Sequence, residues 1–300
     1  MKSYAKQSEI LFLWDVENAN PNGDILNDNA PRYDEVSHRA LISDVRVKRT
    51  IRDDLFDRKN QEIFVRETAS KKGGINDGKA RVQDVIGKEE DVVATLIDKC
   101  IDVRAFGGVF PVGGKAYNLT GSIQFKMTKS LHEVKNPTYI KGTGAFASTE
   151  GANQKTFREE YILPYALFGT YGVVNGLNSS NTKLTANDVD EVVESLVMGT
   201  KNLITRSKMG QYPRFLLKIN YKENGFFIGE LDNRIKIAKI DNRVDAESDI
   251  RSVDDYTIDM SKIEKLLKKY SDRVESIKYF VDDSFEDKIT IPKSWIKILD

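Results

Sequence analysis

The sequence predicts an α+β fold, because strand-like and helix-like patterns alternate along the chain. An apolar run at 9–16 is typical of a buried strand, and helical spacing begins near Ser43. Two strand-like segments follow. Thr185 and Asp188 then form a helix-start signature before a strand pattern at 212–221. The order strand-helix-strand-strand-helix-strand is that of the ferredoxin-like (RRM-like) fold, here with large insertions between its elements.

The first strand leads into a polar loop over 17–38, which is longer than an ordinary connection and therefore indicates function or mobility. Ser43 is a typical N-cap residue for the helix that we expect to continue to about Phe56. This helix is rich in cations, namely Arg46, Lys48, Arg49 and Arg52. Together, the strand, loop and basic helix start are suited to holding a polyanion backbone.

The helix cations fall into two pairs. Arg46 and Arg49 are three residues apart, and Lys48 and Arg52 are four apart, so each pair shares a helical face. The simpler interpretation is a solvated face whose charge is balanced by three nearby aspartates, Asp53, Asp54 and Asp57. The helix alone favours that simpler interpretation.

The middle of the chain reads as an insertion followed by strands. Residues 58–100 contain a glycine-bearing loop and a helix over 89–100, whose apolar spacing indicates packing. We then expect a strand at 101–106, a glycine-rich loop at 107–115 and another strand at 117–127.

Residues 130–158 are turn-rich and poor in aliphatic side chains, which predicts an extended hairpin or mobile arm with Phe146 at its centre. A strand pattern follows at 161–174. The last segment, 226–300, is expected to hold a strand pair, a helix at 261–270 and a closing strand near 289–299. We treat residues 1–300 as a single domain with insertions.

The composition limits the function. Lys plus Arg and Asp plus Glu both number 46, so the formal net charge is zero, which argues against a free-standing, non-specific nucleic-acid binder. The charge is nevertheless segregated: residues 1–240 carry 35 basic and 31 acidic groups, and residues 241–300 carry 11 and 15.

Metal and membrane sites are not expected. One cysteine and two histidines exclude an intramolecular disulfide, a cysteine-based zinc site and a histidine-rich metal site, so we expect no metal and no cofactor. The apolar run Ile10–Trp14 is too short for a signal peptide or a membrane span. We therefore expect a cytoplasmic protein that does not contact a membrane.

The first strand and the loop carry four aspartates, which raise the alternative of catalysis. Asp15, Asp24, Asp28 and Asp34 could gather a divalent ion for phosphodiester cleavage. Acidic loops more often form turns, because Asp and Asn side chains bond their own backbone. Asn amides, main-chain N–H groups and guanidinium forks suit phosphate and 2′-hydroxyl oxygens better, so we favour binding of an RNA backbone.

A resemblance supports this interpretation. The stretch WDVENANPNGDILNDNAPRYD, followed by HRALISDVRVKRTIRDDL, resembles the Cascade backbone subunit of type I CRISPR systems (the Cas seven family), nearest to subtype I-B. Further matching segments are DVRAFGG with TGSIQF, EEYILPYALFGTYGVVN and RSKMGQYPRFLLKINY. The resemblance thus covers most of the chain.

The resemblance implies an architecture and a function. An RRM-like palm would carry a finger-like helical insertion at about 58–100 and a thumb-like hairpin at about 130–158. The protein would be a non-catalytic subunit that oligomerises along CRISPR RNA in a DNA-targeting Cascade complex and presents guide segments for pairing with target DNA. Its partners would be CRISPR RNA, target DNA, other copies of itself, and the RNA-end-capping, large and small subunits.

The matching positions imply the site residues. The RNA-binding positions would be Asn20, Asn22, Arg32, Arg39, Ser43, Arg46, Lys48, Arg49 and Arg52, and the base-displacing residue of the thumb would be Phe146. Two alternatives stay open. The first is a related backbone subunit that cleaves target RNA with a loop aspartate. The second is a stand-alone binder of some other RNA.

Overall fold

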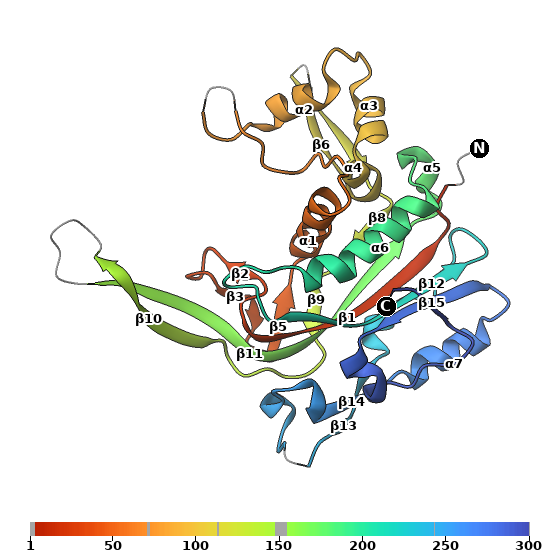
Figure 1. The fold of residues 1–300 in the computed structure, drawn as a ribbon. Helices are drawn as coiled ribbons and strands as arrows, with labels where there is room; N and C mark the ends of the chain where they lie inside the picture. The colour runs from red at the N-terminus through yellow and green to blue at the C-terminus, as the bar shows by residue number, and fades with distance from the viewer. Residues whose placement is uncertain (1–3, 71–72, 113, 148–154, 243, 300) are drawn as a thin grey trace.

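The computed structural model describes residues 4–70, 73–112, 114–147, 155–242 and 244–299, and it has the mixed α+β composition that the sequence predicts (Figure 1). A large sheet runs through the body. Its strands, in order across the sheet, are β16 (Ile296–Lys297), β15 (Val274–Val281), β12 (Gln211–Tyr221), β1 (Ser8–Ala19), β11 (Lys155–Val174), β9 (Thr128–Ser130), β5 (Arg39–Ile42) and β4 (Tyr33–Asp34). Two further strands, β8 (Ile123–Phe125) and β10 (Thr138–Ala147), also pair with β11.

The remaining elements are small strand pairs and helices. The pairs are β2 (Gly23–Asp24) with β3 (Ala30–Pro31), β6 (Gly107–Val112) with β7 (Lys115–Thr120), and β13 (Lys236–Ile240) with β14 (Tyr256–Asp259). The α-helices are α1 (Asp44–Asp57), α2 (Gly78–Ile86), α3 (Val92–Lys99), α4 (Ile101–Phe106), α5 (Ser179–Thr182), α6 (Ala186–Lys201) and α7 (Ser261–Lys269). Short 3-10 turns are η1 (Leu231–Asn233), η2 (Glu247–Asp249), η3 (Val253–Asp255) and η4 (Asp283–Lys288).

Strand β1 lies at the centre of the sheet and is covered on both faces. It pairs antiparallel with β11 on one side and with β12 on the other. Ile10 and Phe12 pack in a core with α1 and α6, whereas Leu11 and Leu13 pack in a second core with α7 and the C-terminal segment. Because successive strand residues point to opposite faces, a strand covered on both sides reads as an unbroken apolar run.

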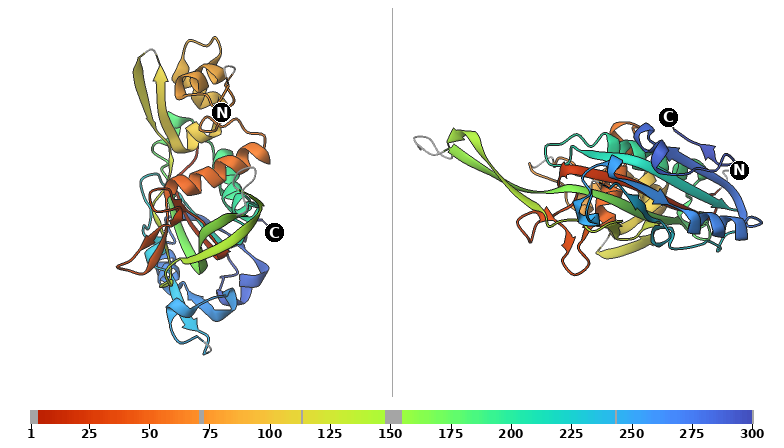
Figure 2. Two further views of the ribbon diagram at one scale, coloured as in Figure 1. Left: turned by 90° about the vertical axis from the view of Figure 1, so that its left-hand side faces the viewer. Right: turned by 90° about the horizontal axis from the view of Figure 1, so that it is seen from below.

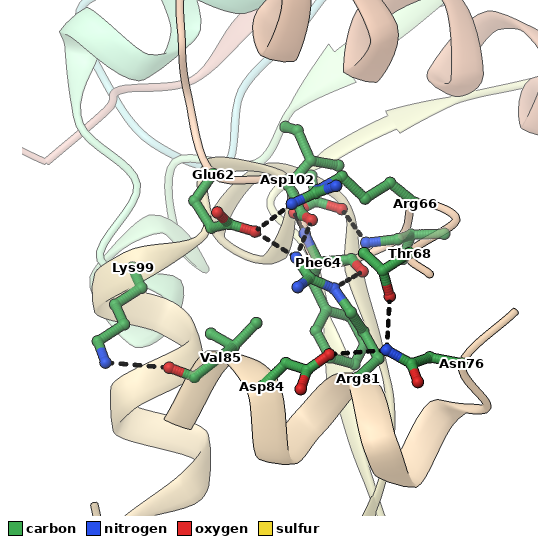
Figure 3. A network of polar contacts seen from close by, with 12 residues as sticks. Glu62, Phe64, Arg66, Thr68, Asn76, Arg81, Asp84, Val85, Lys99 and Asp102 are labelled. Atoms are coloured by element: carbon green, nitrogen blue, oxygen red, sulfur yellow. Dashed lines mark hydrogen bonds and ion pairs between the residues drawn. The ribbon is translucent and has the colours of Figure 1, made fainter. Parts of the chain in front are cut away.

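A separate unit, which we call the insertion unit (residues 62–120), stands above the body in Figure 1. It has its own small core, in which Phe64 and Phe110 meet at 5.1 Å between ring centroids. Figure 3 shows how charged side chains hold its first segment: Asp102 accepts the N–H groups of Phe64 (2.7 Å) and Val65 (3.1 Å), and Arg81 Nε donates to the Phe64 carbonyl at 3.0 Å.

Several predicted elements are confirmed. They are the first strand, the Ser43-capped helix, the strand that ends at Val174, the Thr185–Asp188 capping box of α6, the strand at Tyr221, the β13–β14 pair and α7. The predicted helix at 89–100 is α3, and the sequence interpretation missed α2 before it, which Asp77 caps. The insertion also continues beyond residue 100, since Phe110 and Leu119 belong to its core.

The prediction for 101–127 is wrong in detail. Residues 101–106 form helix α4, not a strand, because Ile101 and Ala105 face the main core while Val103 faces the insertion core. When a short segment is buried on both sides, its residues are apolar all round, so the periodicity of the sequence does not distinguish a helix from a strand. The glycine-rich segment at 107–112 is strand β6. The expected strand at 117–127 breaks at Gly121, where a Cβ would overlap the backbone of Phe106.

The predicted closing strand near 289–299 is confirmed only in part. The strand lies earlier, at Val274–Val281 (β15), and only Ile296 and Lys297 pair as β16. β15 carries Glu275 and Lys278 and is only partly buried over most of its length, so its apolar pattern is weak.

The predicted hairpin is present. β10 pairs antiparallel with the first part of β11, and together they form an arm that projects from the body in Figures 1 and 2. Phe146 belongs to β10, but its side chain lies outside the part of the chain that the structure describes.

Candidate nucleic-acid interface

The polar loop between β1 and α1 is folded by its own asparagines. The side chain of Asn20 donates to the Asn29 carbonyl at 2.7 Å, and Asn22 Oδ1 accepts the Ser43 N–H at 2.7 Å. Both side chains are buried, yet Asn20 Oδ1 has no hydrogen-bond partner. Asn22 therefore joins the loop to the start of α1, whereas Asn20 keeps one acceptor unused.

The start of α1 holds Arg46 against this loop. Ser43 caps the helix, its hydroxyl accepting the Arg46 N–H at 3.3 Å. The Arg46 guanidinium donates to the Pro21 carbonyl at 2.9 Å and to Gln211 Oε1 at 3.4 Å, and it also contacts the Thr50 hydroxyl. Burial lowers the pKa of Arg46 to about 10, and Arg46 stays charged at neutral pH.

Lys208 approaches the same place from the segment before β12. Its ammonium donates to the Asn20 carbonyl at 2.8 Å, and Gln211 Nε2 donates to the Lys208 carbonyl at 2.8 Å. Burial, together with the charge of Arg46, lowers the pKa of Lys208 to about 8. The segment is fixed over the end of β1, since Asn20 N–H bonds the Ser207 carbonyl at 2.8 Å.

Arg46 and Lys208 thus form a pair of partly buried cations. Across the described ranges of the chain, no carboxylate forms an ion pair with either side chain. Charges removed from water normally have a counter-ion, so two neighbouring cations without one are prepared for an anion. The sequence interpretation did not select Lys208, although it lies in the matched RSKMGQ segment.

The other α1 cations have different surroundings. Lys48 and Arg52 share a face, as predicted, because both lie over the Phe106 ring. Arg52 is nevertheless buried and pairs with the fully buried Asp102 at 2.9 Å, which joins α1 to the insertion unit. Lys48 bonds Asp44 and Gln124, each at 3.0 Å.

Arg49 is the exposed cation of α1. It pairs with Asp53 at 2.7 Å, which matches the solvated-face interpretation for this position, and hydrogen bonding to Asp53 raises its pKa. An exposed pair of this kind contributes little to stability and is easily exchanged for another anion. Arg49 is therefore available to a ligand.

Two further arginines precede α1: Arg32 in the polar loop and Arg39 in β5. Arg32 pairs loosely with Asp24 at 3.4 Å, and its buried Nε has no hydrogen-bond partner. Arg39, in β5, reaches the Ser130 carbonyl at 3.5 Å and Glu247 at 3.6 Å. All three contacts are long, so each guanidinium keeps N–H donors that can bond a ligand.

The loop aspartates act on the backbone. Asp24 accepts the Leu26 N–H at 3.3 Å, and Asp34 accepts the Val36 N–H at 3.1 Å, so both form turns. Asp28 is exposed, whereas Asp15 is fully buried and pairs with Arg214 at 2.7 Å. Burial raises the pKa of Asp15. In the part of the chain that the structure describes, no three His, Cys, Asp or Glu side chains gather as a metal site would require.

The fold and this surface define an α+β protein in which two partly buried cations, Arg46 and Lys208, lie beside a polar loop and can bind an anion. The family model described as CRISPR-associated protein Cas7 matches residues 6–261. A curated protein of Haloferax volcanii, named CRISPR-associated protein Cas7, is 30% identical over 308 residues, covering 93% of this chain and 88% of its own length. The chain belongs to the Cas7 family.

Solved structures share the fold. A chain of a CRISPR RNA-guided surveillance complex in a pre-nicking state matches with a TM-score of 0.59 at 14% identity, covering 97% of this chain and 96% of its own. A chain of another CRISPR RNA-guided surveillance complex matches with a TM-score of 0.51 at 13% identity, covering 97% and 94%. Among the described residues, no helix is long and apolar enough to span a membrane.

Proposed function

We propose that this chain is a CRISPR RNA-binding backbone subunit of a type I, DNA-targeting effector complex, nearest to subtype I-B. Copies would stack along one guide RNA, together with the end-capping, large and small subunits, and would leave guide segments free to pair with target DNA. Membership of the Cas7 family and the likeness to chains of surveillance complexes support this proposal. We further propose that it acts in the cytoplasm, as a scaffold and not as an enzyme.

The observation that carries the proposal is the pair of unneutralised cations, Arg46 and Lys208. An RNA phosphate seated there would supply the missing counter-ion. The exposed Arg49 and the unsaturated Arg32 and Arg39 would extend the path along the strand. Asn20 Oδ1 is an unused acceptor, and a 2′-hydroxyl is a donor that suits it.

We assign the remaining predicted residues by their surroundings. Lys48 would contact RNA after releasing Asp44. Asn22, Ser43 and Arg52 would act indirectly, because their bonds hold the loop, the helix start and the insertion unit in place. Phe146 stays the proposed base-displacing residue of the arm.

We also propose that the body is a ferredoxin-like palm. The strand order β12-β1-β11-β8 and the packing of α1 and α6 on one face of the sheet support it. The insertion unit would be the finger, and the β10–β11 arm would be the thumb.

The test is to express the chain with its CRISPR array and to sequence the RNA that copurifies. We expect guide RNA with a repeat-derived end. Lys208→Gln should lower the salt slope of RNA binding, the change in log affinity with log salt, by about 0.7 for one lost phosphate contact. Lys293→Gln, which removes an exposed lysine of the C-terminal segment, should leave the slope unchanged.

Two outcomes would overturn the proposal. If the Lys208→Gln protein is folded and its salt slope is unchanged, Lys208 does not contact an RNA phosphate and the cation pair is not part of the RNA-binding surface. Regularly spaced cuts in complementary RNA with Mg²⁺, lost when Asp28 becomes Ala, would favour the RNA-cleaving alternative, since Asp28 is an exposed loop carboxylate.

A further inference from the structure

Helix α7 carries a row of lysines that the proposed RNA path does not use. Its apolar residues Ile263 and Leu267 are buried in the core on the C-terminal side of the sheet. Its exposed face carries Lys262, Lys265, Lys268 and Lys269. Within the described ranges no ion pair or hydrogen bond involves any of these four side chains, and the helix carries only one acidic residue, Glu264.

Helix stability does not explain this row. Lys268 and Lys269 lie in the last turn, where positive charge is favourable to the helix dipole, but Lys262 lies in the first turn, where it is unfavourable. Lys265 is three residues from Lys262 and four from Lys269, so like charges adjoin on one face and repel one another. A chain that keeps such a row benefits when an anion neutralises it.

The row lies far from the proposed RNA interface. α7 packs on the face of the sheet opposite to α1 and α6. It also sits at the end of the molecule away from the β10–β11 arm, as Figures 1 and 2 show. A strand bound at Arg46 and Lys208 is therefore separated from α7 by the sheet and its two core layers.

The surroundings of the row favour a nucleic-acid backbone over a protein partner. Protein interfaces have an apolar centre, whereas no large apolar side chain of α7 is exposed. Lys262 and Lys269 are separated by about 10 Å along the helix axis, at about 1.5 Å per residue. Phosphates on one strand of a duplex recur about every 3.4 Å along the duplex axis, so a row of this length that lies along the axis spans about three of them.

We propose that the exposed face of α7 binds the phosphate backbone of duplex DNA without reading its sequence. The proposal rests on the proposed function, because a DNA-targeting complex brings duplex DNA to this protein beyond the segment paired with the guide. α7 would be a second nucleic-acid surface, on the reverse side of the subunit from the guide RNA.

The test compares the RNA-loaded assembly with a variant that combines Lys262→Gln, Lys265→Gln and Lys269→Gln. The probe is a labelled duplex of about 30 base pairs that does not match the guide, titrated at several NaCl concentrations. We expect the salt slope to fall by about 2.7, at about 0.9 per lost phosphate contact. A matched variant with Lys183, Lys201 and Lys293 changed to Gln removes the same charge from other exposed positions and should keep the wild-type slope.

Two results would overturn the proposal. Equal slopes for the two triple variants would show that α7 does not hold DNA. Absence of duplex binding by the wild-type assembly at low salt would instead point to an acidic protein as the partner of α7. Retained RNA separates the two proposals: the α7 variant should copurify with the same RNA as the wild type even if α7 does not bind DNA.

Discussion

Helices α1 and α7 are both basic, yet their cations lie in different surroundings. In α1, Arg52 is buried against Asp102 and Arg46 is packed beneath the polar loop. In α7, all four lysines are exposed and form no ion pair or hydrogen bond within the described structure, and Lys269 lies over the Tyr270 ring at 5.0 Å from its centroid. A second element covers α1, whereas none of the described elements covers the exposed lysines of α7. A row of cations in a sequence therefore does not show which of them are already neutralised by the protein and which are left for a ligand.

The strongest test of this comparison is Arg52→Ala. Removing Arg52 leaves the fully buried Asp102 without its cation and, in the described structure, with two backbone N–H donors. Breaking a buried ion pair in this way costs about 3–5 kcal/mol, and the two remaining donors place the expected loss near 3 kcal/mol. Urea unfolding measures it. Arg49→Ala, which removes an exposed pair of the same helix, should cost less than about 1 kcal/mol. Equal losses would contradict the distinction between the two arginines.

The next test uses pH. The pKa of Lys208 is about 8 in the free protein because burial, together with Arg46, disfavours its charge. A bound phosphate favours the charged form, so RNA affinity should fall as pH rises through 8, by at most about tenfold per pH unit. RNA binding measured from pH 7 to 9.5 tests this. Lys208→Arg keeps its charge over this range and should flatten the curve; the same fall in that variant would assign the effect to another group.

The same pKa shift affects stability with the opposite sign. The folded state releases the Lys208 proton near pH 8, whereas an unfolded lysine keeps it to about 10.5. Between these values the unfolded chain binds more protons, so the contribution of Lys208 to the free energy of unfolding should rise with pH. Weaker RNA binding above pH 8 would therefore not come from unfolding at this site.

The smallest expected effect is at Lys262. Replacing it by Glu places a negative charge in the first turn of α7 and removes repulsion from Lys265, so the protein should gain about 0.5 kcal/mol of stability. Thermal unfolding measures this gain, and we expect the melting temperature to rise by a few degrees or less. The same substitution in the assembly should weaken duplex DNA binding. A loss of stability would show that Lys262 has a structural partner and would weaken the case for an open row.

The sequence predicted the elements that carry a clear signal in their own residues. β1, α1 with its Ser43 cap and α6 with its capping box all follow local rules of apolar spacing and end capping. α4 and β15 were missed for opposite reasons. Two cores bury α4 from both sides, so its apolar residues show no helical periodicity. β15 is only partly buried over most of its length, so it shows no clear alternation of apolar and polar residues.

The candidate site was only partly predictable for a related reason. The helix spacing places Lys48 and Arg52 on one face, but the partner of Arg52 lies 50 residues away in α4. Lys208 is distant from the loop in sequence and meets Asn20 only through the tertiary fold. Local patterns identify which residues are charged, and only the fold decides which charges are already neutralised.

Strand β11 runs without interruption from the projecting arm into the middle of the sheet. Its 20 residues span about 65 Å when extended, and the first part pairs with β10 while the later part pairs with β1. Successive side chains of a β-strand point to opposite faces, so adding one residue to an arm strand would turn the side chains on one side of the insertion to the opposite face. Adding two residues to each arm strand would preserve both faces. Length variation in this arm should therefore proceed in steps of two residues per strand.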